Sequence, residues 1–346
     1  MHIFLYVYNM LFPNPVRDII QLSEKVVEIR VLSTEAKLLL RSMSHHVNVG
    51  KLKKGEAQYS LLTNDKGGMV DDLIVYCVEE GQDYLLCVNA ANKDKDLDWI
   101  LKNNKGADVT DESEVWGQIA VQGPKAMKLL AKIFGESVND VKSFCFKEFD
   151  FHGAICLVAR TGYTGEDGAE VFVPNNSAAA LWRKLLTEGE ELEVQAIGLG
   201  ARDTLRTEMK YSLYGHEIDD HSNPYEAGLG WVVKPKDKDF IGKDIIVAHK
   251  EAGLKRKLVG FKMIDRGIAR EGYKLFSFDN NEIGSVTSGT PSPSTGDNIG
   301  IGYVPLEYAA EGSEFLVEIR AKKVKAMVKY VFNRLAYQLV LQILIQ

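Results

Sequence analysis

Apolar residues in the first two thirds of the chain fall into short runs that predict β-strands. These runs are either continuously apolar or alternate with polar residues at every second position, which is the period of a strand. On this basis we predict strands at residues 73–75, 84–88, 117–121, 154–158 and 170–173.

Three other segments carry the signals of helices. In GPKAMKLLAKIFG, Pro124 suits the first turn, the apolar residues share one face, and Gly135 marks the end. The segment NNSAAALWRKLLTEG offers Asn or Ser as the N-cap and closes at Gly189. The segment GLGARDTLRTEMKYSLYG is expected to enter a helix through its first two glycines, with Asp203 in the first turn, where the helix dipole favours an acid.

The pattern changes after about residue 255. Short β-rich segments, KRKLVGFKMI, EGYKLFSF, EIGSVTSG and IGIGYVPL, are separated there by turn residues. This spacing is typical of a small antiparallel barrel or sandwich. The whole pattern predicts an α+β fold, with mixed α and β structure first, all-β structure last, and a boundary near KPKDKDFIGKD.

Composition places the chain among ordinary globular proteins. Its 346 residues suffice for two or three domains, and 45% are hydrophobic and 26% charged. A formal net charge of −6 argues against nucleic acid or an anionic membrane as the main partner. Four cysteines without a CxxC pair predict reduced thiols in an intracellular compartment.

Two adjacent carboxylates interrupt the apolar strand in NDKGGMVDDLIVY. Asp is disfavoured in strands, and burying an unpaired carboxylate is costly. Successive side chains of a strand point to opposite faces, so Asp72 shares a face with Tyr76 and Asp71 lies on the other. We therefore expect no shared proton between the two. One is expected to cap the Gly67–Gly68 turn, and the other either packs structurally or serves an elongated ligand.

Other motifs are less specific. RTGYTGEDGAE is expected to be a close-approach loop centred on Tyr163, but it lacks the Lys-Ser/Thr of a P-loop. GLGARD lacks the third glycine of a dinucleotide fingerprint. Arg202 and Arg206, one helical turn apart, suit a solvated or ion-paired face or an anion clamp. The pair His45 and His46 has no evident third ligand for zinc. The residues alone indicate an enzyme or binder with a pocket lined by Tyr, Asp and Arg.

Longer stretches carry a resemblance to a known family. KLKKGEAQYSLLTNDKGGMVDDLIVY, LLCVNAANKDKDLDWI, RTGYTGEDGAEVFVP, GLGARDTLRTEMKYSLYGHEIDD and VTSGTPSPSTGDNIGIGYVP resemble, in this order, the aminomethyltransferases, which are the T-proteins of the glycine cleavage system. The resemblance implies a three-domain cloverleaf with tetrahydrofolate in a central channel. The expected divisions are 1–110 and 111–245 as folate-binding regions, 246–334 as a β-barrel domain and 335–346 as an apolar tail.

The resemblance also implies a reaction. The methylene of an aminomethyl group on the dihydrolipoyl arm of H-protein passes to tetrahydrofolate, and ammonia and 5,10-methylenetetrahydrofolate are released. Expected partners are lipoylated H-protein and, functionally, the P- and L-proteins, without a metal, nucleic acid or membrane. The expected location is the cytoplasm, with the mitochondrial matrix as the alternative. Another folate-dependent transferase or demethylase, or a non-catalytic folate binder, remain as alternatives, and a nicotinamide-dependent dehydrogenase is the weakest.

Family positions assign roles to individual residues. Asp72 matches the key acid beside the reacting folate nitrogens, where it would orient the cofactor and stabilise positive charge in the transition state. The matching folate-site positions are Tyr59, Tyr76, Asn89, Tyr163, Glu170, Arg202 and Glu208. Arg334 matches a basic position expected to face the lipoyl arm or the folate tail. The first twenty-five residues depart from the family pattern, so we expect a damaged first domain.

Overall fold

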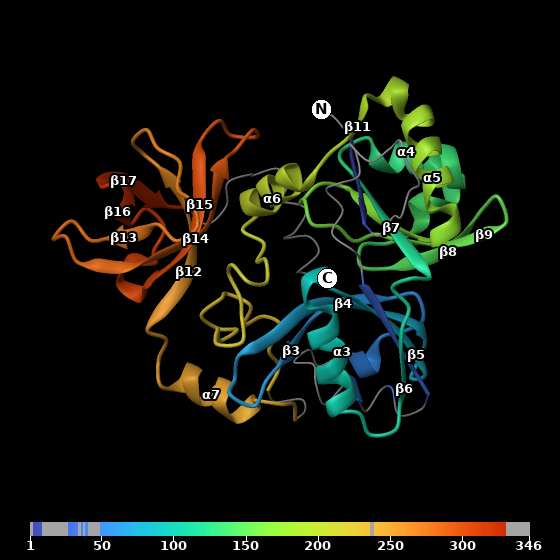
Figure 1. The fold of residues 1–346 in the computed structure, drawn as a ribbon, viewed down its shortest axis with the longest axis horizontal. Coiled ribbons are helices and arrows are strands. Elements are labelled where there is room, and N and C mark those ends of the chain that lie inside the picture. The colour runs from blue at the N-terminus through green and yellow to red at the C-terminus, as the bar shows by residue number, and fades with distance from the viewer. Residues whose placement is uncertain are drawn as a thin grey trace. The chain divides into compact units, whose positions relative to one another are not determined.

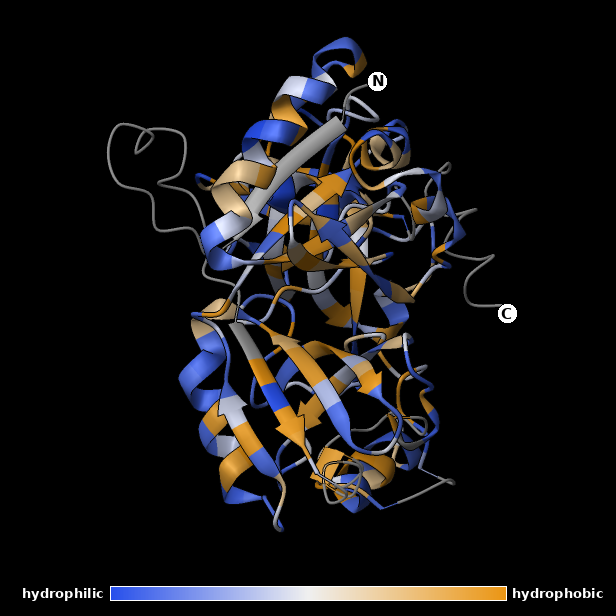
Figure 2. Ribbon diagram, turned by 90° about the vertical axis from the view of Figure 1, so that its right-hand side faces the viewer, coloured by the Kyte–Doolittle hydropathy of each residue, from blue (hydrophilic) through white to orange (hydrophobic). Residues whose placement is uncertain are grey.

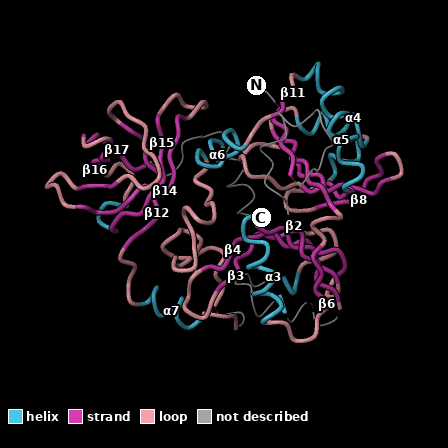
Figure 3. Tube along the Cα trace, viewed as in Figure 1, coloured by secondary structure: helices cyan, strands magenta, loops and turns pink. Residues whose placement is uncertain are grey.

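The computed structural model describes residues 3–8, 27–33, 36, 39–40, 49–235 and 239–329. The chain divides into two compact units, and Figures 1 and 3 draw their helices and strands. The first comprises Met1–Leu62, Asp71–Ala201 and Asp237–Phe240, and the second comprises Thr63–Val70, Arg202–Lys236 and Ile241–Gln346. Among the described residues, no helix has both the length and the apolar character needed to cross a membrane.

The first unit contains a six-stranded sheet with the order β11-β1-β7-β10-β9-β8. Its central strands β7 and β10 are antiparallel, and Ile119 lies opposite Val171. Strand β1 pairs antiparallel with β7 and parallel with β11. The strands are β1 (Ile3–Tyr8), β7 (Trp116–Gln122), β8 (Phe146–Phe151), β9 (Ala154–Ala159), β10 (Gly168–Pro174) and β11 (Val194–Ala196).

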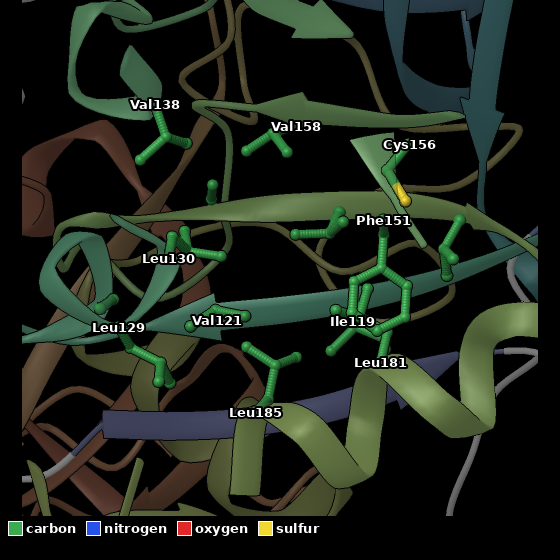
Figure 4. Close-up of a cluster of buried hydrophobic side chains, with 14 of the residues drawn as sticks. Ile119, Val121, Leu129, Leu130, Val138, Phe151, Cys156, Val158, Leu181 and Leu185 are labelled. Atoms are coloured by element: carbon green, nitrogen blue, oxygen red, sulfur yellow. The ribbon is translucent and has the colours of Figure 1, made fainter. Parts of the chain in front are cut away.

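Helices α4 (Ala126–Phe134) and α5 (Asn175–Gly189) pack their apolar faces into the core of this sheet. Figure 4 shows Leu181 and Leu185 of α5 directed toward Ile119 and Val121 of β7. All four are fully buried, and each such side chain contributes roughly 1.5–3 kcal/mol of hydrophobic stabilisation. Figure 2 shows the matching pattern, with mainly hydrophobic strands and helices that also carry hydrophilic residues. Helix α4 ends at Gly135, whose φ of 86° suits glycine.

A second sheet of the first unit has the order β3-β4-β5-β2-β6. Strands β4 and β5 are antiparallel, and Ile74 lies opposite Cys87. Tyr76 of β4 packs edge-on against two aromatic rings of the six-stranded sheet, 5.6 Å from Phe146 and 5.2 Å from Phe172. The elements are β2 (Val27–Leu32), β3 (Ala57–Thr63), β4 (Met69–Glu79), β5 (Asp83–Val88), β6 (Asp108–Asp111) and α3 (Lys93–Lys102).

The second unit contains a closed antiparallel barrel with the order β12-β15-β14-β13-β16-β17. Phe261 and Phe315 meet edge-on in its core at 5.3 Å. Gly300 makes room for Phe261, because a Cβ there would lie 2.4 Å from the ring. The elements are α7 (Lys243–Glu251), β12 (Arg256–Met263), β13 (Lys274–Phe276), β14 (Glu282–Pro291), β15 (Asn298–Pro305), β16 (Glu314–Ile319) and β17 (Lys322–Val328). Helix α6 (Leu199–Glu208) spans the division between the units.

The predicted strands and helices are present, with local corrections. The all-β region is a closed barrel, which decides between barrel and sandwich. Helix α5 has Pro174 at its N-cap without a side-chain cap, so the prediction of an Asn or Ser cap was wrong. Asp203 lies beyond the first turn of α6 and pairs with Arg206 instead.

Candidate functional site

Asp72 lies on β4, directly across from the end of β5. The Tyr59 hydroxyl donates to Asp72 Oδ2 at 2.9 Å, and Asn89 Nδ2 donates to Asp72 Oδ1 at 3.0 Å. The register that sets Ile74 opposite Cys87 places Asn89, the first residue after β5, opposite Asp72. Strand pairing therefore brings three residues predicted for the site into direct contact.

The surroundings of Asp72 raise its pKa to about 7. Burial of the carboxyl group is the largest cause, and the negative charge of Asp71 is the second, while hydrogen bonds from Tyr59 and Asn89 act in the opposite direction. The residue retains a partly exposed surface. Burial, then Asp72, raises the pKa of Tyr59, and Tyr163 adds a smaller contribution. A partly accessible acid with a pKa near neutrality can stabilise a cation or exchange a proton.

Asp71 is fully buried and faces a different set of donors. Asn89 donates to it twice, from the backbone N–H at 3.2 Å and from Nδ2 at 2.8 Å, and Asn92 Nδ2 donates at 2.9 Å. The prediction of an Asp cap for the Gly67–Gly68 turn was wrong. Asn64 Oδ1 accepts from the N–H groups of Lys66 and Gly68 instead. The Asn89 amide contacts both carboxylates, which links two side chains that we expected to be independent.

Helix α3 places a third carboxyl group against Asp71, and sequence reasoning missed it. Asp96 is fully buried, and burial followed by interactions with Asp71 raises its pKa to about 11. Its position relative to Asn92 was a usable signal, because residues four apart lie on the same side of a helix. Both residues are part of the motif LLCVNAANKDKDLDWI.

Glu170 belongs to a second network within the first unit. Thr161 Oγ1 donates to Glu170 Oε2 at 2.6 Å, and the Tyr76 hydroxyl lies 3.1 Å from the same Thr161 oxygen. Tyr76 is only 1% exposed, so its ring packs in the core and its hydroxyl supports Thr161. Gln122 Nε2 donates to the carbonyls of Thr161 and Ala169 at 3.2 and 3.3 Å, which holds both ends of this segment.

The loop at residues 160–167 has the close-approach geometry expected of its glycines. A Cβ at Gly162 would lie 2.1 Å from Gln122 Oε1, so only glycine allows this contact without a shift. Arg160 donates to the carbonyls of Gly168 and Val141 and pairs with Asp167. Its guanidinium group therefore holds the loop together.

Arg202 and Glu208, both on α6, belong to the second unit. Glu208 is buried and accepts hydrogen bonds from the Ser294 N–H at 3.1 Å, from Ser294 Oγ at 2.6 Å and from Ser292 Oγ. Arg206 is buried and pairs with Glu217 and Asp203, each at 2.6 Å, which makes it part of the core of this unit. Three residues discussed from the sequence, Arg334, His45 and His46, lie outside the described residues.

The cysteines are all free, and two of them are fully buried. Burial raises the pKa of Cys77 to about 11 and that of Cys156 to about 12, which keeps both as unreactive thiols. Among the residues that the structure describes, no three His, Cys, Asp or Glu side chains are grouped to hold a metal ion.

Comparisons with known proteins agree with this architecture. The GCVT N-terminal domain model matches residues 23–237, and the glycine cleavage T-protein C-terminal barrel domain model matches residues 256–331. An aminomethyltransferase of Bdellovibrio bacteriovorus is 60% identical over 301 residues, covering 87% of this chain and 83% of the relative. One of Desulforamulus reducens is 45% identical over 282 residues, covering 81% and 77%.

A solved structure gives the same result for the fold. The crystal structure of glycine cleavage system aminomethyltransferase T from Bartonella henselae superposes with a TM-score of 0.84 at 30% identity, covering 96% of this chain and 87% of that one. The family and fold predicted from the sequence, mixed α/β structure followed by a barrel, are therefore confirmed. The chain belongs to the glycine cleavage T-protein family, whose N-terminal and barrel domains it carries in order.

Proposed function

We propose that this chain is a tetrahydrofolate-dependent aminomethyltransferase. It transfers the methylene of the aminomethyl group on dihydrolipoyl H-protein to tetrahydrofolate. The carbon–sulfur and carbon–nitrogen bonds of the methylene break, and two bonds from it to folate nitrogens form. The two protons that these nitrogens lose pass to the leaving ammonia and to the dihydrolipoyl sulfur, and reduced H-protein and 5,10-methylenetetrahydrofolate are released. Membership of the family and the names of relatives 60% and 45% identical support this activity. Neither supports a dehydrogenase or a non-catalytic binder.

The observation that carries the proposal is the setting of Asp72. Tyr59 and Asn89 hold its two oxygens from two sides, so the carboxylate needs little reorganisation when charge develops nearby. Above its pKa of about 7 the group is ionised and stabilises a cationic transition state. A preorganised charge in a site of low dielectric is worth far more than in water.

The described residues of the first unit suit a reduced pterin. Tyr59 contacts the Asp72 carboxylate and Tyr163 acts on Tyr59; both are partly exposed aromatic residues, and rings of this kind stack on planar ligands. Tetrahydrofolate would supply the nitrogen nucleophile. Asp72 and Asn89 would orient it through hydrogen bonds, and Glu170, fixed by Thr161, would accept from N–H groups of the pterin.

The other predicted site residues differ in how directly this proposal involves them. Arg202 belongs to the second unit, and its role toward the acidic end of folate stays a prediction. Tyr76 and Glu208 would act indirectly, because Tyr76 supports Thr161 and Glu208 holds the turn at Ser292 and Ser294. Arg334 stays a prediction. Lipoylated H-protein is the proposed partner, with the P- and L-proteins as functional associates, and the bacterial cytoplasm is the proposed location because the relatives named above are bacterial.

The test is turnover of the purified chain with aminomethylated, lipoylated H-protein and tetrahydrofolate. We expect ammonia and methylenetetrahydrofolate in equal amounts, with both substrates required. Reactions lacking folate, and reactions with Asp72→Asn, serve as controls. Folate binding by calorimetry without any product would refute the catalytic proposal and identify a folate-binding protein. Absence of both binding and product would refute the folate assignment.

A further inference from the structure

The carboxyl group of Asp96 is buried without a hydrogen-bond donor. The residue is 0% exposed, and among the described residues neither of its carboxyl oxygens has a donor. After burial, interactions with the Asp71 carboxyl group are the largest cause of the raised pKa of Asp96. An ionised carboxylate in such a place would lose its solvation without compensation. Two carboxyl groups in contact resolve this conflict by sharing one proton.

The division of protons between the two groups follows from their other partners. Asp71 receives three N–H donors, from the Asn89 backbone, the Asn89 amide and the Asn92 amide, and these stabilise a carboxylate. The charged groups that act on Asp96 are Asp71 and Asp72 of β4 and Lys95 of its own helix. The two negative neighbours disfavour a charged Asp96 more than the single positive neighbour favours it, so the proton stays on Asp96.

We propose that Asp96 is a positioning residue that is protonated at neutral pH and donates a hydrogen bond to the carboxylate of Asp71. Asp71 accepts hydrogen bonds from Asn89 and so holds it, and Asn89 in turn donates to the carboxylate of Asp72. The role of Asp96 in turnover rests on the function proposed above, whereas its protonation does not.

Hydrogen bonds connect Asp71 to Asp72, and Asp96 acts on Asp71 from the helix that follows Asn92. Asn92, the N-cap of α3, and Asp96 lie one helical turn apart, so both residues present a donor to Asp71 once Asp96 is protonated. Asp71 Oδ1 lies 2.8 Å from Asn89 Nδ2, and the same nitrogen lies 3.0 Å from Asp72 Oδ1. The negative charge of Asp71 is also the second cause of the raised pKa of Asp72. Asp96 therefore affects both the position and the ionisation of the working acid.

Infrared spectroscopy tests the proton directly and requires no turnover. At about pH 9, which lies above the Asp72 pKa of about 7 and below the Asp96 pKa of about 11, the wild-type protein should show the C=O stretch of a protonated carboxylic acid, and the band should shift when the protein is exchanged into deuterated buffer. Asp96→Asn should remove this band, while the exposed control Asp98→Asn on the same helix should retain it. A band that survives in Asp96→Asn, or a wild-type protein without one, overturns the proposal even if the enzyme is active.

Kinetics test the positioning role. Asp96→Asn keeps a neutral donor toward Asp71 and should retain most of the wild-type kcat with an unchanged pH profile. Asp96→Leu removes the donor and should lower kcat about tenfold or more, the scale typical of groups that orient a working residue, with the KM for H-protein unchanged. Equal losses in both variants would contradict a donor role, and wild-type kcat in Asp96→Leu would contradict positioning. If Asp96→Leu does not fold, Asp96→Asn decides, because a neutral donor of the same shape that failed to fold or turn over would refute the proposal.

Discussion

A buried acid that stays protonated should make the protein less stable as the pH rises, and Asp96→Asn should remove this effect. In the unfolded chain the Asp96 carboxyl group ionises with its ordinary pKa of 3.8, whereas in the folded protein its pKa is raised to about 11. Between these two values the folded state binds the extra proton. Each pH unit above 3.8 therefore lowers the free energy of unfolding.

The size of the effect at neutral pH follows from this linkage. The ordinary pKa of 3.8 lies about three units below pH 7, and each unit is worth about 1.4 kcal/mol. Ionisation of Asp96 therefore stabilises the unfolded state at pH 7 and lowers the free energy of unfolding by about 4 kcal/mol. This figure requires only that the folded pKa exceed 7. Asn cannot ionise, so Asp96→Asn recovers the cost, less about 1 kcal/mol for exchanging an O–H donor for an amide. We expect a net stabilisation of about 3 kcal/mol at pH 7 and almost none near pH 4.

Urea unfolding of the wild type, Asp96→Asn and the exposed control Asp98→Asn at pH 4.5, 6 and 7.5 measures this difference. The gap between Asp96→Asn and the wild type should widen with pH by about 1.4 kcal/mol per unit, while Asp98→Asn should follow the wild type. A gap that stays constant with pH, or a destabilisation that grows with pH, would show that Asp96 is ionised in the folded protein and would refute the reasoning.

Three further predictions concern the neighbours of Asp96 and the core of the second unit. Asp72→Asn should lower kcat by about 10²-fold or more in the H-protein assay, and an activity equal to that of Asp71→Asn would refute its assignment. Asp71→Asn removes a charge that raises the pKa of Asp72, so the acid limb of kcat/KM should move to lower pH; an unmoved limb would contradict this coupling. Arg206→Leu leaves Glu217 buried without its 2.6 Å partner and should cost about 3–5 kcal/mol by urea unfolding, whereas a loss below about 1 kcal/mol would show that the pair contributes little.

The sequence was most informative where the apolar residues of a whole helix or strand followed one regular spacing. The apolar runs of β4, β5 and β7 and the capped stripe of α4 predicted those elements because burial on one or both sides leaves a regular pattern. Strand β8, FKEFDF, was missed because only its two end residues are buried, so its middle reads as polar. An edge strand of this kind forms through pairing with a neighbour, which the local sequence does not encode.

The site was predictable only in part, for a related reason. Asp72 and Tyr59 could be placed from motifs, but the contact of Asn89 with both carboxylates depends on the register of β4 and β5. Helical spacing could group Asp96 with Asn92, but it could not predict that Asp96 acts on Asp71, because the packing of α3 against the sheet is not encoded in local spacing. Spacing along a chain predicts which side chains share a face, and it does not predict which face another element will cover.

Asp at position 96 makes the folded protein less stable at neutral pH than Asn would, and in return it holds the Asp71 carboxylate in place more firmly. An O–H donor makes a shorter and stronger bond to a carboxylate than an amide N–H does, so protonated Asp96 fixes Asp71 more tightly than Asn could. Asp72 adds a cost of the same sign, because its pKa rises from 3.8 to about 7 and stability is lost as the pH climbs through that window. The same burial that destabilises the ionised Asp72 gives it a pKa near neutrality and a fixed orientation. The carboxyl groups of Asp71, Asp72 and Asp96 therefore act together, and their burial is the common cause of the lost stability and of the properties that suit Asp72 to its proposed role.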